Sequence, residues 1–384
     1  MGNYRVAIVG CGPRGSAISL AYAAHPRTTV VAVCDLRREL RDRLGETLRL
    51  SYRYADLDEM ISATKPDLVV IATGTEFHHE LALRVLAHGV HIDIEKPLTT
   101  DLRRADEVLK LARKKRVRVA VHHQGRVCAS MRAVARALRE GRIGRVRHLI
   151  GSGKGYYGGY GLLNIGTHTL NAMLRLAGPC AEVSGTLLVD RRPARPEDVV
   201  LAPNGMGPIA GEDITASLRF ANGITGTLLH QRFPVVDATA HAIEVLGTEG
   251  RLLWKNDEAH WLPQPHFVPD GEHDHWQRLS ADDLPGYDPN ACGEAEYAFA
   301  DEYVRALDEG REHECSGAEG LHVMEIMMGI FESGAMGRPV ALPQRKRDHP
   351  LLRWRAQAGL PEPPAVSRNY PSWLLQEDRR LGRS

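Results

Sequence analysis

The chain has 384 residues and a formal net charge of +1, with 43% hydrophobic and 25% charged residues. These are the values of an ordinary globular protein, and the near-neutral charge argues against a dedicated nucleic-acid binder. The length exceeds what one hydrophobic core usually serves, so we expect two domains. A strand predicted almost at the N-terminus leaves no room for a signal peptide, and no apolar run is long enough to cross a bilayer. The six cysteines are scattered without a CxxC pair, which argues against a zinc ribbon or a dense disulfide framework. Together with the charge and the lack of an apolar span, this leads us to expect a cytoplasmic protein without membrane or nucleic-acid partners.

The first third of the chain alternates short apolar runs with helix-like segments. Strands are expected at residues 5–9, 29–34, 68–72, 91–94 and 117–121, and helices at 15–24, 80–87 and 102–112. Alternation of strands and helices predicts right-handed crossovers and a parallel sheet. We therefore expect residues 1–124 to form an α/β, doubly wound domain.

The pattern changes after residue 124 to longer strands that are joined by tight turns. Residues 215–220 and 224–229 flank Ala221-Asn222-Gly223, an Asn-Gly turn that is typical of a hairpin. A second hairpin is expected from residues 241–246 and 251–255. We expect residues 125–345 to form an α+β domain with a large, open and mainly antiparallel sheet.

Three further helices and two irregular segments are expected in this second half. The helices are predicted at residues 131–139, 294–309 and 320–332, and the last two pack either on the second domain or on the first. A long loop is expected at 261–289, which is rich in Pro, Asp and His. The C-terminal tail, residues 346–384, is expected to wrap the surface or a partner subunit.

A glycine motif follows the first predicted strand. Gly10-Cys11-Gly12-Pro13-Arg14-Gly15 reads GxGxxG and opens a predicted helix. In this context Gly10 makes a tight turn, Gly12 lets the backbone approach a pyrophosphate, and Gly15 lets helix and strand pack closely. The helix N-terminus, with Pro13 and Arg14, offers free N–H groups and partial positive charge to the phosphates. The motif predicts a dinucleotide-binding Rossmann domain.

Asp35 ends the second predicted strand and completes the fingerprint. A carboxylate there accepts hydrogen bonds from the adenosine ribose hydroxyls and repels a 2′-phosphate, so it favours NAD over NADP. Arg37 and Arg38 follow closely and are able to pair with a 2′-phosphate. NADP therefore stays open as a second cofactor.

A second motif, Glu95-Lys96-Pro97, follows the strand predicted at 91–94. Sites in open α/β sheets lie at the carboxyl ends of the strands, which puts Lys96 at the same edge as the glycine motif. A lysine beside a dinucleotide is suited to hold a substrate hydroxyl and shift its pKa.

These motifs occur in one order with Thr73, His78 and a later Gly166-Thr167-His168, and the set resembles the glucose–fructose oxidoreductase and inositol dehydrogenase family (Gfo/Idh/MocA). The resemblance extends from about residue 4 to 342. It implies a nicotinamide cofactor, carbohydrate-like substrates, and a C-terminal open-sheet domain that carries substrate and subunit contacts. It makes Lys96 the catalytic lysine and places Thr73, His78 and Glu95 by the cofactor. Gln124 and Arg126 fall where the family has Asn-x-Arg near the nicotinamide.

The sequence departs from the family pattern in its second half. The family has Asp-x-x-x-His, whereas this chain reads Asn164-Ile165-Gly166-Thr167-His168. An Asp orients the imidazole and stabilises its cation, and Asn164 supplies no charge, so we expect His168 to be harder to protonate than in relatives. Asn164, like Asn171, is equally consistent with helix capping. Gly74 and Gln124 also replace the proline and asparagine that are common in the family.

A glycine-rich stretch at residues 151–161 contains Tyr156 and Tyr157. Tyrosine rings and hydroxyls there are suited to line a sugar site, and the stretch is equally consistent with a mobile glycine-rich loop. The histidine pairs of the chain lack zinc-site spacing, so no metal is expected.

The sequence therefore predicts an NAD(P)-dependent oxidoreductase that transfers a hydride between the nicotinamide and a secondary alcohol or ketone of a sugar, glycoside or polyol. Lys96 would polarise the reacting oxygen and His168 would exchange the proton. Two alternatives remain: an enzyme that retains NAD and uses transient oxidation for glycosidic cleavage or elimination, and a cofactor-binding protein without turnover, which the absent acid at Asn164 suggests. An open sheet needs covering, so we expect a homo-oligomer, a dimer or a tetramer.

Overall fold

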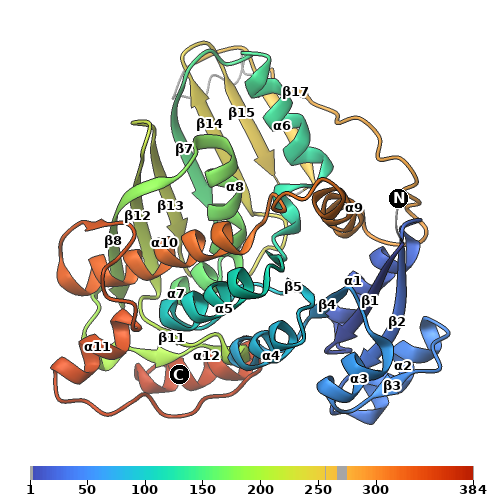
Figure 1. The fold of residues 1–384 in the computed structure, drawn as a ribbon. Helices are drawn as coiled ribbons and strands as arrows, with labels where there is room; N and C mark the ends of the chain where they lie inside the picture. The colour runs from blue at the N-terminus through green and yellow to red at the C-terminus, as the bar shows by residue number, and fades with distance from the viewer. Residues whose placement is uncertain (1–2, 256, 266–274, 384) are drawn as a thin grey trace. The chain divides into compact units, whose positions relative to one another are not determined.

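The computed structural model describes residues 3–255, 257–265 and 275–383, which form two compact units (Figure 1). Unit 1 contains residues up to 99, 103–129 and 283–321, and unit 2 contains 100–102, 130–282 and the chain from 322 onward. The units are discontinuous in sequence, unlike the ranges 1–124, 125–345 and 346–384 that the sequence suggested. The segment 283–321 returns to unit 1, and the C-terminal tail packs as part of unit 2.

Unit 1 is built on a six-stranded parallel sheet with the order β3-β2-β1-β4-β5-β6. Its central strands are apolar on both faces, as residues 6–9 and 68–71 illustrate, because helices cover both sides. The strands are β1 (Tyr4–Val9), β2 (Thr28–Cys34), β3 (Arg53–Tyr54), β4 (Leu68–Ile71), β5 (His91–Ile94) and β6 (Val119–Val121). The helices are α1 (Pro13–Ala24), α2 (Arg38–Thr47), α3 (Leu57–Thr64), α4 (Thr75–Ala87), α5 (Leu102–Lys115) and α9 (Glu294–Asp308).

Helix α9 joins unit 1 although it lies far along the chain. Its buried residues Phe299 and Tyr303 belong to the same hydrophobic core as Ile8 of β1 and Ile18 of α1. The Tyr303 hydroxyl donates to the carbonyl oxygen of Ile92 at 2.7 Å, so the helix is also hydrogen-bonded to the sheet.

Unit 2 is built on a ten-stranded sheet in which β7 and β13 pair in parallel and the other pairs are antiparallel. The α/β architecture with a Rossmann domain and a mainly antiparallel second sheet confirms the predicted fold class. Strands of this sheet are β7 (Val146–Ser152), β8 (Cys180–Val189), β9 (Arg192–Pro193), β12 (Asp213–Phe220), β13 (Thr225–His230), β14 (Ala242–Gly247), β15 (Arg251–Lys255), β16 (Glu258–Leu262), β17 (Gln277–Arg278) and β18 (Val340–Ala341). A separate pair comprises β10 (Val200–Leu201) and β11 (Pro208–Ile209). The expected loop at 261–289 thus contains the end of β16 and all of β17, and residues 266–274 lie outside the described residues.

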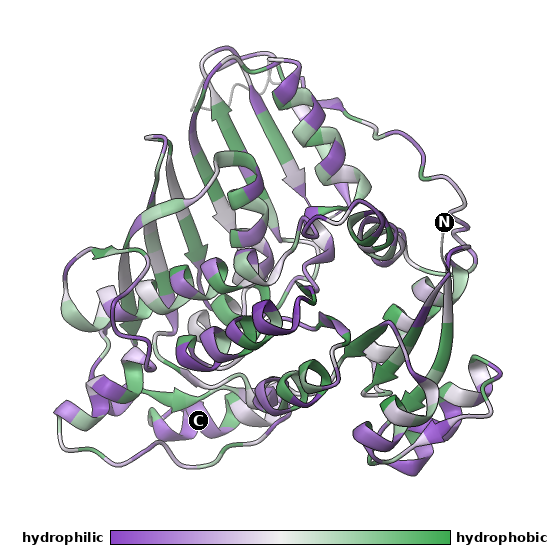
Figure 2. Ribbon diagram, viewed as in Figure 1, coloured by the Kyte–Doolittle hydropathy of each residue, from purple (hydrophilic) through white to green (hydrophobic). Residues whose placement is uncertain are grey.

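One face of the unit 2 sheet is covered by helices, and hydrophobic residues concentrate on its strands (Figure 2). Strand β12 alternates strictly, with Ile214, Ala216 and Leu218 buried and the residues between them more exposed. Helix α10 packs so closely that a side chain at Gly185 would meet the Ile330 carbonyl oxygen at 2.6 Å. The helices of this part are α6 (Ala129–Arg139), α7 (Gly158–Gly161), α8 (Thr167–Ala177), α10 (Gly317–Met336), α11 (Pro350–Gln357) and α12 (Tyr370–Arg380), with the first turn of α10 in unit 1.

The C-terminal tail is anchored on unit 2 by a buried tryptophan and by ion pairs. Trp373 of α12 is buried, and its indole N–H donates to the Leu201 carbonyl oxygen at 2.8 Å. The Arg232 guanidinium contacts both carboxylate oxygens of Asp378, at 2.7 and 2.8 Å. In the part of the chain that the structure describes, no helix has the length and apolarity to cross a membrane.

Candidate active site

The three glycines of the GxGxxG turn have three different surroundings. Gly10 has φ of +92°, and a side chain there would lie 2.5 Å from the Ala72 carbonyl oxygen. A side chain at Gly15 would lie 1.8 Å from the Gly10 carbonyl oxygen, so only glycine permits this packing. A side chain at Gly12 would meet no atom within 4 Å. Open space at Gly12 beside the α1 N-terminus, which starts at Pro13 and has no acidic residue in its first turn, fits a dinucleotide diphosphate.

Asp35 lies at the end of β2, next to this turn. Its Oδ2 accepts a hydrogen bond from the Cys11 N–H at 2.8 Å, and its Oδ1 accepts from the Arg37 N–H at 2.8 Å. A carboxylate accepts about four hydrogen bonds, so both oxygens keep capacity for ribose hydroxyls. The Arg37 guanidinium is exposed and lies 3.8 Å from Asp35 Oδ1.

Glu95, directly after β5, is buried and holds Arg14 in place. Arg14 Nε donates to Glu95 Oε1 at 2.8 Å, and its Nη1 donates to Glu296 Oε1 at 3.0 Å. Burial alone would raise the pKa of Glu95, but the charges of Arg14 and His122 lower it below its usual value. Arg14 Nη2 is buried without a hydrogen-bond partner in the structure. A buried donor of this kind beside the glycine turn fits an anionic or carbonyl-bearing ligand.

Behind Glu95 lies a buried polar cluster that the sequence did not reveal. His122 Nδ1 is 3.0 Å from Asp93 Oδ1, and Tyr22 donates its hydroxyl to Asp93 Oδ2 at 2.9 Å. Burial would lower the pKa of His122, but Asp93 and Glu95 outweigh it and raise the pKa. The cluster fixes the end of β5, where Lys96 begins the next loop. Its members are far apart in sequence, so no local pattern identifies them.

His78 braces the loop that carries Lys96. Its ring is fully buried, with Nδ1 2.9 Å from the Pro97 carbonyl oxygen and Nε2 3.2 Å from the Thr73 carbonyl oxygen. Burial lowers the pKa of His78. Both ring nitrogens face backbone carbonyls, so His78 positions the Thr73 and Glu95-Lys96-Pro97 loops and does not offer a nitrogen to a cofactor. Thr73 itself is half-buried at the end of β4.

Gln124 and Arg126 form a short 3₁₀ turn after β6. The Gln124 side-chain oxygen is buried without a partner, which fits a ligand with an N–H donor. Arg126 Nη1 lies 3.2 Å from Glu319 Oε2, so a carboxylate orients it. Burial, together with the charges of Lys96 and Arg126, lowers the pKa of His123 well below its usual value and keeps that ring neutral.

In unit 2, Asn164 lies in a π-helical turn, Leu162–Gly166, that leads directly into α8. His168 is the second residue of α8 and is half-buried. The wide turn encloses the buried ring of His230: side chains at Gly161 and Gly166 would lie 3.0 Å from its Nδ1 and 2.8 Å from its Nε2. Burial lowers the pKa of His230 to about 3, so a neutral imidazole supports the turn. Single π turns of this kind are frequent at functional sites.

Asn164 is hydrogen-bonded to a tyrosine that the sequence did not single out. Its Nδ2 donates to the Tyr160 hydroxyl at 3.1 Å, and Asn204 Nδ2 donates to the same oxygen at 3.1 Å. Burial raises the pKa of Tyr160 to about 12 although the Asn204 bond opposes the rise, so the phenol is neutral. Asn164 is therefore oriented by a side-chain network and does not cap α8, whose N-terminus follows Gly166.

The two tyrosines predicted to line a sugar site have different surroundings. Tyr156 is half-buried and packs edge-on against Tyr160, with ring centroids 5.3 Å apart. Tyr157 is fully buried, and its hydroxyl donates to Glu377 at 3.1 Å. Tyr157 is thus a core residue of unit 2 and is left out of the candidate site. The stretch 151–161 contains the end of β7 and the helix α7, so most of it is ordered backbone.

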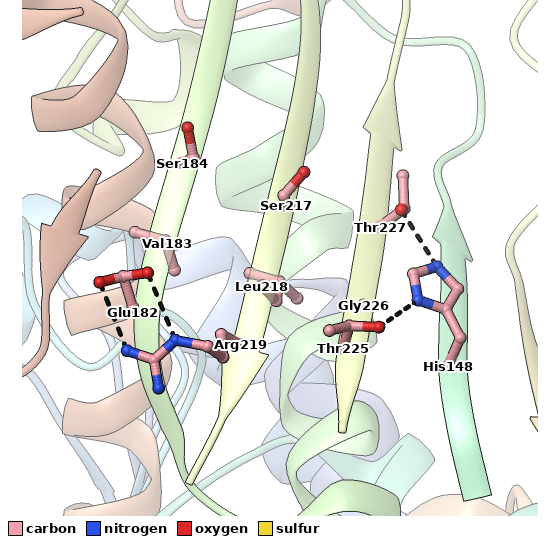
Figure 3. Close-up of a pocket in the computed structure, with 10 residues that line it drawn as sticks. All are labelled: His148, Glu182, Val183, Ser184, Ser217, Leu218, Arg219, Thr225, Gly226 and Thr227. Atoms are coloured by element: carbon pink, nitrogen blue, oxygen red, sulfur yellow. Dashed lines mark hydrogen bonds and ion pairs between the residues drawn. The ribbon is translucent and has the colours of Figure 1, made fainter. Parts of the chain in front are cut away.

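A shallow hollow lies on the open face of the unit 2 sheet, the face that the helices do not cover (Figure 3). His148 lies between the hydroxyls of Thr225 and Thr227, at 2.7 and 3.1 Å, and Arg219 pairs with Glu182 at 3.3 Å. The hollow contains none of the predicted site residues. Among the described residues, no group of three or more His, Cys, Asp and Glu side chains is arranged to hold a metal ion.

The Rossmann sheet, the GxGxxG turn and Asp35 define a dinucleotide-binding protein, and the comparisons give its family. Residues 4–123 match the Gfo/Idh/MocA oxidoreductase family model described as an NAD-binding Rossmann fold, and residues 154–342 match its C-terminal alpha/beta domain. The chain belongs to this family of oxidoreductases, as its motifs predicted.

Three similar proteins illustrate the relationship. A levoglucosan dehydrogenase of Pseudarthrobacter phenanthrenivorans is 24% identical over 90% of this chain and 99% of its own length. A levoglucosan dehydrogenase structure in complex with NADH and levoglucosan has a TM-score of 0.74 at 22% identity, over 89% of this chain and all of that one. A glycosyl hydrolase family 109 protein of Streptomyces coelicolor is 30% identical over a shorter region, 36% of this chain and 32% of its own length.

Proposed function

We propose that this oxidoreductase uses NAD to transfer a hydride to or from a secondary alcohol or ketone of a sugar, glycoside or polyol. The observation that carries the proposal is the carboxyl edge of the unit 1 sheet. There the glycine turn, Asp35 and the Glu95-Lys96 loop lie at the ends of neighbouring parallel strands, β1, β2, β4 and β5. The similarity to a levoglucosan dehydrogenase over most of both chains supports a carbohydrate substrate.

The nicotinamide would supply hydride acceptance, and the protein residues would bind and polarise. The Gly10–Gly15 turn and the α1 N-terminus hold the diphosphate, and Asp35 holds the adenosine ribose. Lys96 donates a hydrogen bond to the reacting oxygen and stabilises negative charge that develops on it. His168 exchanges the proton of that oxygen. Asn164, whose Nδ2 donates to the Tyr160 hydroxyl, would bind a substrate hydroxyl or the His168 ring through its amide oxygen.

The test is NADH formation from NAD with a panel that contains levoglucosan, methyl glycosides and open-chain polyols. We expect turnover with at least one sugar, loss of turnover in Lys96→Ala, and nearly unchanged NADH binding in that variant because the proposed role of the lysine is to hold the substrate more than the cofactor. Lys110→Ala, an exposed lysine on α5, is the matched control and keeps wild-type rates. Wild-type activity in Lys96→Ala would remove the lysine from the mechanism.

A second candidate is an NAD-retaining enzyme that cleaves a glycosidic bond through transient oxidation. The regional similarity to the glycosyl hydrolase family 109 protein favours it. Release of free sugar from a glycoside without net NADH identifies this activity, whereas net NADH identifies the dehydrogenase. Binding of NADH and sugar without any product identifies a binding protein.

We further propose a reducing, cytoplasmic location and NAD as the preferred cofactor, with NADP as the weaker one. None of the six cysteines forms a disulfide in the structure and five of them are buried, which suits a reducing compartment. Asp35 supports NAD, and the exposed guanidinium of Arg37 is the group that would accommodate NADP.

We also propose that the open face of the unit 2 sheet packs against a second copy, giving a dimer or a tetramer. The half-buried apolar residues Ile150, Leu188 and Leu253 lie on this face, between rows of Ser and Thr. A face of this kind gains from being covered. Light scattering should give a mass that is a multiple of 42.4 kDa, the mass of one chain. A mass of 42.4 kDa at every concentration would refute the assembly.

A further inference from the structure

The C-terminal tail contributes a tyrosine to the surroundings of Asn164. Tyr370, the first residue of α12, stacks on Tyr160 with ring centroids 4.8 Å apart and an angle of 20° between the planes. Tyr156 stands nearly perpendicular to Tyr370, with centroids 5.0 Å apart. Three rings from two distant segments thus form one cluster, which we call the tyrosine wall (Tyr156, Tyr160 and Tyr370). Tyr370 lies beyond residue 342, where the family match ends.

The tyrosine wall is joined to the candidate site by hydrogen bonds. The Tyr160 hydroxyl accepts from Asn164 and from Asn204, both at 3.1 Å. The backbone N–H of Asn204 in turn donates to the Arg368 carbonyl oxygen of the tail at 3.2 Å. Asn164 and the tail therefore share one network, and moving the tail changes the surroundings of Asn164.

The wall is partly open and is held rigidly. Tyr160 is buried, whereas Tyr156 and Tyr370 are half-buried. The Tyr370 ring also stacks on Trp373, with centroids 6.0 Å apart and an angle of 20° between the planes. The Tyr370 hydroxyl accepts from the Tyr157 N–H at 2.9 Å, and Trp373, one turn along α12, is buried. Tyrosine rings that are already fixed lose little conformational entropy when a ligand packs on them.

We propose that the tail is a specificity element of the substrate site, in which Tyr156, held by the perpendicular ring of Tyr370, binds the C–H face of a pyranose ring while Asn164 binds one of its hydroxyls. The inference rests on the proposed function and narrows it. A closed sugar ring presents a flat apolar face to an aromatic ring, and an open-chain polyol does not. Amide groups beside the rings supply the hydrogen bonds that a sugar edge needs. The wall therefore selects pyranosides over open-chain polyols.

The experiment compares KM and kcat for a methyl pyranoside and for an open-chain polyol in Tyr370→Leu, Tyr370→Phe and Leu375→Ala. Leu375 is on the same helix and 60% exposed, so its variant is the matched control. In Tyr370→Leu we expect KM for the pyranoside to rise about tenfold, with kcat and the polyol KM changed by less than about twofold. Tyr370→Phe keeps the ring and should stay within about threefold of wild type. NADH affinity should be the same in all variants.

Thermal unfolding checks that each variant is folded. If Tyr370→Leu does not fold, Tyr156→Leu replaces it, and we expect the same rise in KM for the pyranoside. Wild-type KM for the pyranoside in folded Tyr370→Leu, or equal losses on both substrates, overturns the inference and leaves the proposed function standing. If the wild type turns over no sugar, saturation-transfer NMR with the pyranoside decides. If the pyranoside binds to the wild type and not to Tyr370→Leu, the tyrosine wall is supported although the proposed reaction fails. If the pyranoside does not bind to the wild type, both the inference and the proposed function are overturned.

Discussion

Alanine at Gly12 should weaken cofactor binding without destabilising the fold, whereas alanine at Gly15 should destabilise the fold itself. Gly12 has φ of −73° and ψ of −172°, an extended conformation that alanine adopts without strain, and its added methyl would meet no atom within 4 Å. Replacing glycine at such a position stabilises a protein by ~0.4–1 kcal/mol, because the unfolded chain loses freedom. Gly12→Ala should therefore melt at the wild-type temperature or a few degrees above it.

The same methyl group lies where a dinucleotide diphosphate would approach the turn. We expect the NADH dissociation constant of Gly12→Ala to rise at least about tenfold, which is ~1.4 kcal/mol of binding free energy. Gly15→Ala is different, because its methyl would lie 1.8 Å from the Gly10 carbonyl oxygen, where no flexible side chain can yield. Overpacking of this kind costs ~1–3 kcal/mol or more, so the folded state itself should be destabilised.

The assay combines thermal unfolding of the cofactor-free protein with fluorescence titration of NADH. The expected pattern is normal melting and weak binding for Gly12→Ala, and a lowered melting temperature for Gly15→Ala. Wild-type NADH affinity in Gly12→Ala would show that the diphosphate does not pass this glycine. If Gly15→Ala melts at the wild-type temperature, the turn accommodates the added methyl group, and the inference that only glycine fits at this position is wrong.

Three further outcomes follow from the same geometry. Asp35→Ala should erode the preference for NAD over NADP, measured by parallel titrations, and tighter NADP binding in the wild type would contradict the role of Asp35. Asn164→Asp should raise the pKa that governs the pH–rate profile, because a carboxylate favours the His168 cation. If the profiles of the wild type and the variant superimpose, Asn164 and His168 do not work as a pair. Burial opposes ionisation of Glu212, but hydrogen bonds from Arg383, the Asp190 N–H and Arg232 lower its pKa from 4.5 to about 2. A depressed carboxyl pKa contributes stability above pH 4.5 that is lost as pH falls toward 2, here ~3 kcal/mol, and Trp373 fluorescence should report release of the tail in that range.

Local patterns predicted the strands β1, β2, β4, β5 and β6 and the binding motif of unit 1, whereas β3, α2 and α3 were not predicted. The strands at 68–71 and 91–94 are short apolar runs between helical segments, which is the pattern typical of strands buried in a parallel sheet. The GxGxxG turn acts through backbone geometry within six residues, so its sequence already contains the constraint. The Asn222-Gly223 turn predicted the β12–β13 hairpin for the same reason.

The tertiary structure decided which distant residues meet. No local signal shows that α9 returns to the unit 1 core, that Asp93 pairs with His122, or that the ring of His230 supports the π turn of Asn164. Tyr370 binds the backbone of Tyr157 across 213 residues of chain. Such contacts depend on how strands order themselves and on which cavities the packed helices leave. These are properties of the whole folded chain, because the free energy of burial is gained only when both partners have been brought together.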